Sequence, residues 1–269
     1  MKYSFLLLLF LPIAALSQPN CNIYKLNGND SCYQACEVAT SGLGAQGSRV
    51  SQMRFDRAIA LCPDLDYAWM EKAVPYLKRG DFITWIQLIN KAVELNPREH
   101  LGYRGWCKYQ FLKDYEGAIR DIEQLDSLKE GDIGYCITGD YHLHIARALC
   151  YKALGQKQKA MEIIEEQLAR PGYEPLLFDF IHLGVLKLET GHPDEALTWL
   201  NKAIATNDYY AEAYYYRAMA YRKLGRQAEC LKDLDQARLF YLAGKKMADP
   251  YSAPADKIYL SDIEQALVR

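Results

Sequence analysis

The chain has 269 residues, of which 50% are hydrophobic and 25% are charged. Its 32 Lys and Arg against 34 Asp and Glu leave a formal charge of −2, which gives no reason to expect nucleic acid as a partner. The length suits one or two domains, and the apolar fraction is large enough for a packed core. The composition therefore excludes a largely disordered chain.

The first 17 residues have the pattern of a secretory signal peptide. Lys2 supplies a positive charge, residues 5–16 form an apolar stretch, and Ala15 and Ser17 are the small residues that precede a cleavage site. We expect residues 1–17 to be removed on export. The alternative is a buried first helix, which the lack of an amphipathic pattern disfavours. No later stretch reaches the roughly 18 to 20 apolar residues of a spanning helix, so we expect a periplasmic or secreted protein, soluble after cleavage.

Residues 18–65 hold half of the eight cysteines. Two stretches of helical period, residues 32–40 and 51–63, predict a degenerate helix pair joined by a Gly-rich connection at 41–47. Export permits disulfides, although the connectivity cannot be deduced from spacing. We expect at least one disulfide within this group to stabilise the weak pair, with a zinc site as a weaker alternative. The four cysteines are Cys21, Cys32, Cys36 and Cys62.

The chain that follows repeats itself. The last two windows are in step at a period of 34 residues, because Phe180 is matched by Tyr214. Each window has a bulky residue, then a small residue that predicts close approach of a second helix, then a glycine that predicts the end of the first helix. These triplets are Trp69, Ala73 and Gly80; Phe180, Gly184 and Gly191; and Tyr214, Ala218 and Gly225, with Ala148 and Gly155 in a further window.

This pattern resembles the tetratricopeptide repeat (TPR) family, whose repeat carries aromatic, small and Pro residues at fixed offsets. The resemblance implies an all-α protein, a right-handed α-solenoid of stacked antiparallel helix pairs, since such pairs cannot bury their apolar faces alone. Residues 66–244 would form about five repeats, and residues 245–269 a C-terminal capping helix, with the helix itself at 255–268. The repeat windows are 66–99, 99–127, 141–174, 177–210 and 211–244.

The second window departs from the pattern. Tyr109 and Ala118 fit, but Gly105 is one residue out of step. The spacing then stretches, which predicts a loop at residues 126–140. This loop and the Gly-rich connection at 41–47 either bind something or merely tolerate insertion, and both interpretations stay open.

Catalytic motifs are scarce. His142 and His144 form a tempting pair, but residues two apart on a helix point about 200° from each other and could not share a metal. The sequence has no Gly-rich phosphate loop, Gly-x-Ser-x-Gly elbow or His-Glu-x-x-His helix. We therefore expect no catalytic residue, no metal and no cofactor, and an enzyme with an unrecognised site is the minor alternative.

In the TPR family the first helix of each pair lines the concave face. That register places aromatic and basic side chains in a candidate groove, which suits a protein or peptide because they offer flat contact area and charge-assisted hydrogen bonds. The alternative is that the aromatic residues pack between helices. The candidate groove residues are Tyr67, Met70, Glu71, Lys78, Tyr103, Arg104, His142, Lys152, Phe178, His182, Tyr215, Tyr216, Arg222 and Lys223, and the same register includes Glu212.

The sequence thus predicts a non-enzymatic protein–protein interaction module of a bacterial cell envelope, with a protein or peptide bound in the concave groove. The alternative is a structural scaffold that self-associates through its terminal repeats. A subset of the family holds the C-terminal carboxylate of chaperones with Lys, Asn and Arg. The groove positions here contain no Asn, which argues against that version.

Overall fold

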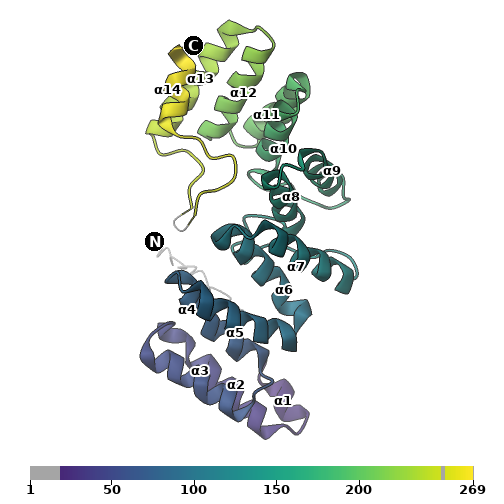
Figure 1. The fold of residues 1–269 in the computed structure, drawn as a ribbon, viewed down its shortest axis with the longest axis vertical. Coiled ribbons are helices and arrows are strands. Elements are labelled where there is room, and N and C mark those ends of the chain that lie inside the picture. The colour runs from purple at the N-terminus through teal and green to yellow at the C-terminus, as the bar shows by residue number, and fades with distance from the viewer. Residues whose placement is uncertain (1–18, 250–251, 269) are drawn as a thin grey trace, which may run out of the picture. The chain divides into compact units, whose positions relative to one another are not determined.

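The computed structural model describes residues 19–249 and 252–268. It divides into two compact units, Met1–Leu95 and Asn96–Arg269, each built of helices (Figure 1). The predicted signal peptide, residues 1–17, lies outside the described residues. Across the described part of the chain, every helix falls short of the length and apolarity that crossing a membrane requires.

The N-terminal unit contains two antiparallel helix pairs, α2 with α3 and α4 with α5 (Figure 1). The sequence of α5 explains its packing, because Trp85, Ile89, Ala92 and Val93 fall on one helical face and are all buried. The elements are α1 (Asn22–Leu26), α2 (Asp30–Ser41), a 3₁₀ turn η1 (Leu43–Ala45), α3 (Arg49–Leu61), α4 (Asp66–Lys78) and α5 (Phe82–Leu95).

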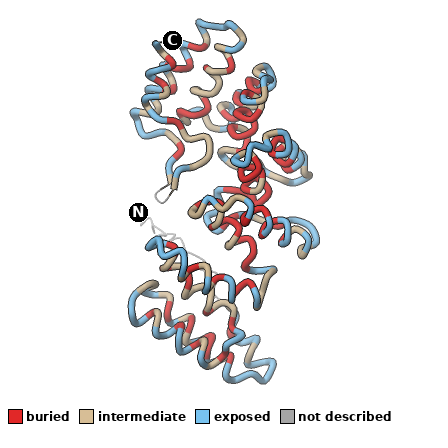
Figure 2. The backbone as a smooth tube through the Cα atoms, viewed as in Figure 1, coloured by how far each residue is buried: buried red, intermediate tan, exposed pale blue. Residues whose placement is uncertain are grey.

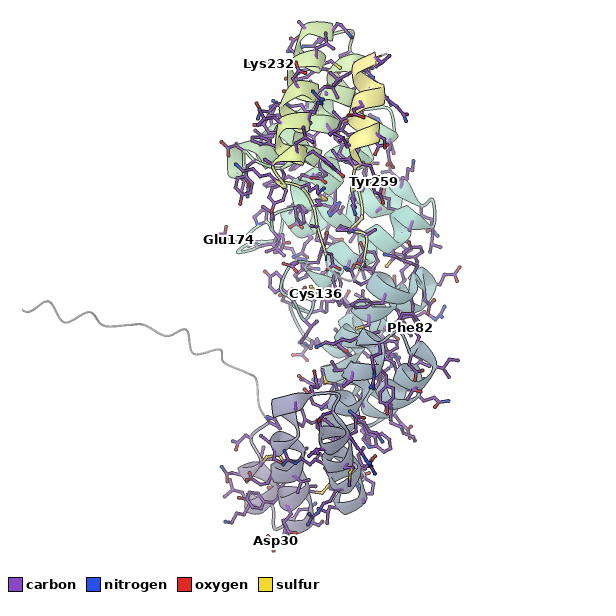
Figure 3. The ribbon with its side chains drawn as sticks, turned by 90° about the vertical axis from the view of Figure 1, so that its left-hand side faces the viewer. Asp30, Phe82, Cys136, Glu174, Lys232 and Tyr259 are labelled. Atoms are coloured by element: carbon purple, nitrogen blue, oxygen red, sulfur yellow. A yellow bond between two sulfur atoms is a disulfide. The ribbon has the colours of Figure 1, made fainter. Side chains whose placement is uncertain are left out.

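Two disulfides join the helices at the start of this unit (Figure 3). Cys21 at the start of α1 bonds to Cys36 on α2, and Cys32 on α2 bonds to Cys62 at the end of α3. The bonds close loops of 15 and 30 residues, which restricts the unfolded chain and so favours the folded pair. Cys32 and Cys36 lie one turn apart on α2 but belong to different bonds.

The C-terminal unit contains four antiparallel helix pairs of its own, and its buried residues lie where successive helices meet (Figure 2). This arrangement confirms the predicted all-α class and the stacked antiparallel pairs. The elements are α6 (Pro97–Cys107), a π-helical turn η2 (Lys108–Leu112), α7 (Tyr115–Leu128), α8 (Leu143–Ala153), α9 (Lys157–Leu168), α10 (Asp179–Glu189), α11 (Pro193–Thr206), α12 (Ala211–Lys223), α13 (Gln227–Leu242) and α14 (Leu260–Val268).

Glycines set both the turns and the closeness of these pairs. Gly191 has a φ of +89°, a left-handed conformation that only glycine adopts without strain, directly after α10 ends. Gly184 lies in the middle of α10, where a Cβ atom would come within 2.7 Å of Cγ of Leu200 on α11. The predicted close approach at Gly184 is therefore confirmed. The other predicted turn glycines, Gly80, Gly155 and Gly225, also have positive φ.

The π-helical turn explains why the second repeat is out of step. A π-turn accommodates one more residue than an α-helical turn. It lies between Gly105 and Lys113, and Lys113 ends it in the left-handed conformation, with a φ of 56°. Residues before the turn are consequently shifted by one position relative to a regular repeat.

The chain after α13 does not continue directly into a helix. Residues 245–259, which we call the C-terminal segment, precede α14, and the described ones, 245–249 and 252–259, form an irregular connection (Figure 1). The predicted helix start at residue 255 is therefore wrong, and α14 begins at Leu260. Asp256 has a φ of 59°, which a right-handed helix cannot accommodate.

Candidate functional site

The candidate site lies on α8, α10 and α12, the first helices of three consecutive pairs in the C-terminal unit. The C-terminal segment contacts all three of these helices. We call this surface of α8, α10 and α12 the groove. The contacts of the C-terminal segment indicate which chemical groups the groove can bind. They fall into two groups, one around Glu212 and one around Asp256.

The first group fixes the start of the segment to α12. The backbone N–H of Ala211 donates to the carbonyl of Lys245 over 3.0 Å, which satisfies one of the unpaired N–H groups at the start of the helix. The N–H of Met247 donates to Oε2 of Glu212 over 3.0 Å. Burial raises the pKa of Glu212, and the N–H groups of Met247 and Ile258 partly oppose that shift.

The side chain of Met247 fills an apolar part of the groove. It is fully buried in a cluster with Ile181 and Val185 of α10 and Ala213 of α12, and Tyr216 packs against the cluster. Burying such a side chain contributes about 1.5–3 kcal/mol. This contact carries much of the apolar attraction between segment and groove.

The second group surrounds the carboxylate of Asp256. Oδ2 accepts a hydrogen bond from Nδ1 of His182 over 2.7 Å, and Oδ1 is ion-paired with the ammonium of Lys152. Lys152 also lies 3.3 Å from Oε1 of Glu189. Burial would raise the pKa of Asp256, but the hydrogen bond from His182 and the charge of Lys152 hold it below its ordinary value. Asp256 is therefore a carboxylate at neutral pH.

Aromatic rings enclose this ion pair. The ring of His182 stacks on Tyr141 with centroids 5.7 Å apart and meets Phe178 edge-on at 6.4 Å. Burial, and then the charge of Asp256, raise the pKa of Tyr216. A hydrogen bond to a carboxylate is stronger in such surroundings than in water, so the rings favour a paired acidic group at this position.

Helix α14 packs against α12 and α13, the last helix pair. Ile263 and Ala266 pack with Ala218 of α12 and Leu234 of α13, and Nη2 of Arg222 donates to the carbonyl of Ala266. Arg222 thus binds a backbone carbonyl of the chain itself.

The structure brings several of the predicted groove residues together and engages them with the C-terminal segment or α14. Lys152, His182 and Arg222 make the polar contacts described above, and Phe178 and Tyr216 line the same surface.

Two further candidates on α12 differ from these. Tyr215 is half-buried and meets Tyr216 edge-on, with centroids 5.2 Å apart. Lys223 is exposed, and its ammonium donates to the carbonyl of Leu188 at the end of α10 over 2.9 Å. Lys223 therefore stabilises the end of the neighbouring helix.

His142 is not exposed in a groove, because it is fully buried at the start of α8. Its Nδ1 accepts from the N–H of His144 over 3.1 Å, and its Nε2 donates to Oδ1 of Asp132 over 2.7 Å. The sequence argument treated both histidines as helical, whereas α8 begins at Leu143, so their rings lie only 5.1 Å apart. Within the described residues no group of three or more His, Cys, Asp or Glu is placed to hold a metal ion.

Arg104 faces α7 rather than the groove. Its Nε and Nη2 donate to the two carboxylate oxygens of Asp121 over 2.9 and 2.6 Å. Arg217 makes the same forked contact with Asp233, so the two arginines occupy equivalent positions. The one-residue shift at the π-helical turn explains why the sequence register assigned Arg104 to the concave face.

Tyr103 lies at a different hollow, a pocket of about 290 Å³ between α6, α7 and the loop before α8. Charged and apolar groups alternate around it. Its lining residues are Arg98, Glu99, Gly102, Tyr103, Leu125, Lys129, Ile133, Gly134, Tyr135, Ile137 and Leu143.

The N-terminal unit carries the four remaining candidates on α4. The Gly-rich connection covers part of them, because Nε2 of Gln46 donates to Oε2 of Glu71 over 2.7 Å. Lys78 is exposed and its ammonium donates to Oε1 of Gln46 over 3.5 Å, while Tyr67 and Met70 are half-buried. Burial raises the pKa of Glu71, which the contacts to Gln46 and Lys78 partly oppose.

The family model for the tetratricopeptide repeat matches residues 141–170, which include α8 and α9. The match falls within the stacked antiparallel pairs of the C-terminal unit. Residues 141–170 are therefore a tetratricopeptide repeat. The comparison with curated proteins gave no match.

Several solved structures share this fold. YrrB, described as a TPR protein with an unusual peptide-binding site, is 18% identical with a TM-score of 0.53, over 71% of this chain and 97% of YrrB. PilW, described as a widely conserved type IV pilus biogenesis factor, is 17% identical with a TM-score of 0.57, over 80% of this chain and 94% of PilW. Pseudomonas aeruginosa PilF is 13% identical with a TM-score of 0.60, over 80% and 94%. At these identities the likeness concerns the fold alone.

Sequence reasoning missed the residues that fill the groove. Asp256 and Met247 lie in a segment with no repeat pattern, so no register could assign them. The two apolar residues Met247 and Ile258, set among breakers and polar residues, are the one signal that this segment packs on something.

Proposed function

We propose that this protein is a non-enzymatic interaction module that binds an extended polypeptide in the groove formed by α8, α10 and α12. One observation carries the proposal: the groove already holds an irregular stretch of polypeptide, namely the C-terminal segment. The contacts combine a backbone hydrogen bond, a buried apolar side chain and a charged pair, which together are the usual elements of peptide recognition. YrrB, which has a peptide-binding site, accords with this proposal.

The proposal also places the protein in the cell envelope. Two disulfides within the N-terminal unit favour an oxidising compartment, because cytosolic thiols are kept reduced. The pattern of residues 1–17 points the same way. Mass spectrometry of the non-reduced protein from its source cell should find a mature chain starting at Gln18, with Cys21 and Cys62 among the oxidised residues. An intact residue 1–17 with free thiols would contradict export.

Capture of a partner from envelope extract tests the groove directly. The full chain is the bait, and the variant Lys152→Met removes the ammonium while keeping most of the aliphatic stem. Because Lys152 lies inside the groove, we expect this variant to lose most of the captured polypeptide.

Lys232→Met is the matched control, since Lys232 is an exposed residue of α13 (Figure 3). The control should capture as much partner as the unmodified chain. Equal capture by both variants would show that any partner binds elsewhere.

A further inference from the structure

The polar centre of the groove is occupied by the chain itself. Asp256 lies 104 positions after Lys152 and 74 after His182, yet it contacts both. Its side chain is 6% exposed, and that of His182 is fully buried. The contact is therefore a built interior site and not a chance meeting of surface charges.

The occupant has a definite chemical pattern. Met247 and Ile258 are both buried apolar residues, and Asp256 lies between them in the sequence. Asp256 also adopts the left-handed conformation, which among residues other than Gly is most accessible to Asn and Asp. The occupant is thus an aspartate at a turn between two buried apolar residues, Met247 in the groove and Ile258 in the cluster formed by α12, α13 and α14.

Fewer backbone hydrogen bonds hold the segment than hold the helices beneath it. Its described residues lack the repeating backbone hydrogen bonds of a helix and bind instead through a few separate contacts. Ala248, Ala253 and Tyr259 remain exposed along it. Segments with few buried contacts open locally at a smaller free-energy cost than the core of a fold.

We infer that residues 245–259 are an intramolecular ligand of the groove, and that a partner displaces them by presenting an extended segment with an aspartate between apolar residues. The inference rests on the proposed function, because it concerns the same groove. A partner then pays the cost of releasing the segment, so the apparent affinity falls by the fraction of chains whose groove is open.

A fluorescent peptide with the sequence of residues 245–259 tests the inference by anisotropy. The full chain should bind it weakly, because its own segment competes. The variant Asp256→Asn frees the groove and should bind the same peptide about tenfold more tightly or better. Glu264→Gln, an exposed acid-to-amide change on α14, is the matched control and should behave as the unmodified chain.

The peptide itself provides the second comparison. A peptide of the same sequence with Asp256→Asn should bind the Asp256→Asn chain at least about tenfold more weakly than the unmodified peptide does, since it cannot pair with Lys152. Equal binding of both peptides, or no gain in the Asp256→Asn chain over the unmodified chain, would overturn the inference.

A second variant decides the matter if circular dichroism shows that Asp256→Asn does not fold. Met247→Ala removes the apolar contact and leaves every charge of the groove in place, so it should also bind the peptide more tightly than the unmodified chain. An unchanged affinity would overturn the inference.

The two proposals fail separately. If Lys152→Met abolishes capture of a partner but freeing the segment changes no peptide affinity, the groove binds a partner and the segment is no competitor. If freeing the segment opens the groove to the peptide but envelope extract yields no partner, the intramolecular ligand stands and the interaction function does not.

Discussion

Two Arg–Asp pairs tie the first helix of a repeat to the second. Arg104 with Asp121, and Arg217 with Asp233, make forked hydrogen bonds whose carboxylates are only 4% and 6% exposed. Such planar, two-bond contacts fix the orientation of the two helices as well as attracting them. Arginine at this position therefore has a structural role, and it should not be counted among groove residues.

The buried side chain of His144 makes the free energy of unfolding depend on pH. Burial, followed by the charges of Arg147, His142 and Arg170, lowers the pKa of His144 to about 3. The unfolded chain has a His pKa of about 6.5, so between these values it binds a proton that the folded chain does not. The free energy of unfolding should consequently fall as the pH drops through this window, by up to about 1.4 kcal/mol per pH unit from this residue.

Urea denaturation at about pH 7 and about pH 4 measures this effect. His144→Gln removes the titrating group and should flatten the dependence, whereas His192→Gln, at an exposed position, should leave it unchanged. An equal slope in both variants would show that other groups cause the acid sensitivity.

The sequence register could predict the helix residues that form the groove, but it could not predict the residues of the C-terminal segment that fill it. It placed Lys152, His182 and Arg222 on the first helices because each repeat follows a local pattern. Asp256 reaches them only through the path of a segment with no repeat, and that path depends on contacts 74 and 104 residues away. Local pattern carries no information about such distant pairing.

The close packing of α10 on α11 depends on one residue, Gly184. At Gly184 a Cβ atom would lie 2.7 Å from Cγ and 3.0 Å from Cδ2 of Leu200. Overpacking of this kind costs about 1–3 kcal/mol, against which alanine regains about 1 kcal/mol of helix propensity. The difference is about 0–2 kcal/mol, so we expect Gly184→Ala to lower the free energy of unfolding by about 1 kcal/mol, measured by urea denaturation.

Gly44→Ala is the companion change, because a Cβ atom there would meet nothing within 4 Å. It should alter the free energy of unfolding by no more than about 0.5 kcal/mol. If Gly184→Ala were equally harmless, the two helices would not be in the close contact described.

Helix pairs were predictable from the sequence because their signals are local. Glycines such as Gly191 end the first helix, and small residues such as Gly184 allow the second to approach. The π-helical turn after α6 was not predictable. Its one extra residue shows in the sequence only as a repeat that is out of step by one position. The start of α14 was missed for a related reason: no local pattern in the sequence indicates the left-handed conformation of Asp256 before the helix.

At the scale of the whole molecule, the two units of the fold differ in the features added to their helix pairs. The N-terminal unit is stabilised by two disulfides, and the C-terminal unit holds its own C-terminal segment in the groove. Both the disulfides and the bound segment depend on residues outside the repeat pattern. The repeats provide the framework, and the added residues determine what the groove is free to bind.

Site-specific photo-crosslinking in the source cell tests the central claim most directly. Tyr216, beside Met247 and the charge of Asp256, is replaced by a benzophenone-bearing phenylalanine, with exposed Leu231 of α13 as the control position. We expect Tyr216 to crosslink to residues 245–259 of the same chain and to a second polypeptide, each at the expense of the other. Crosslinks from Tyr216 to neither, or to the same products as from Leu231, would contradict the account.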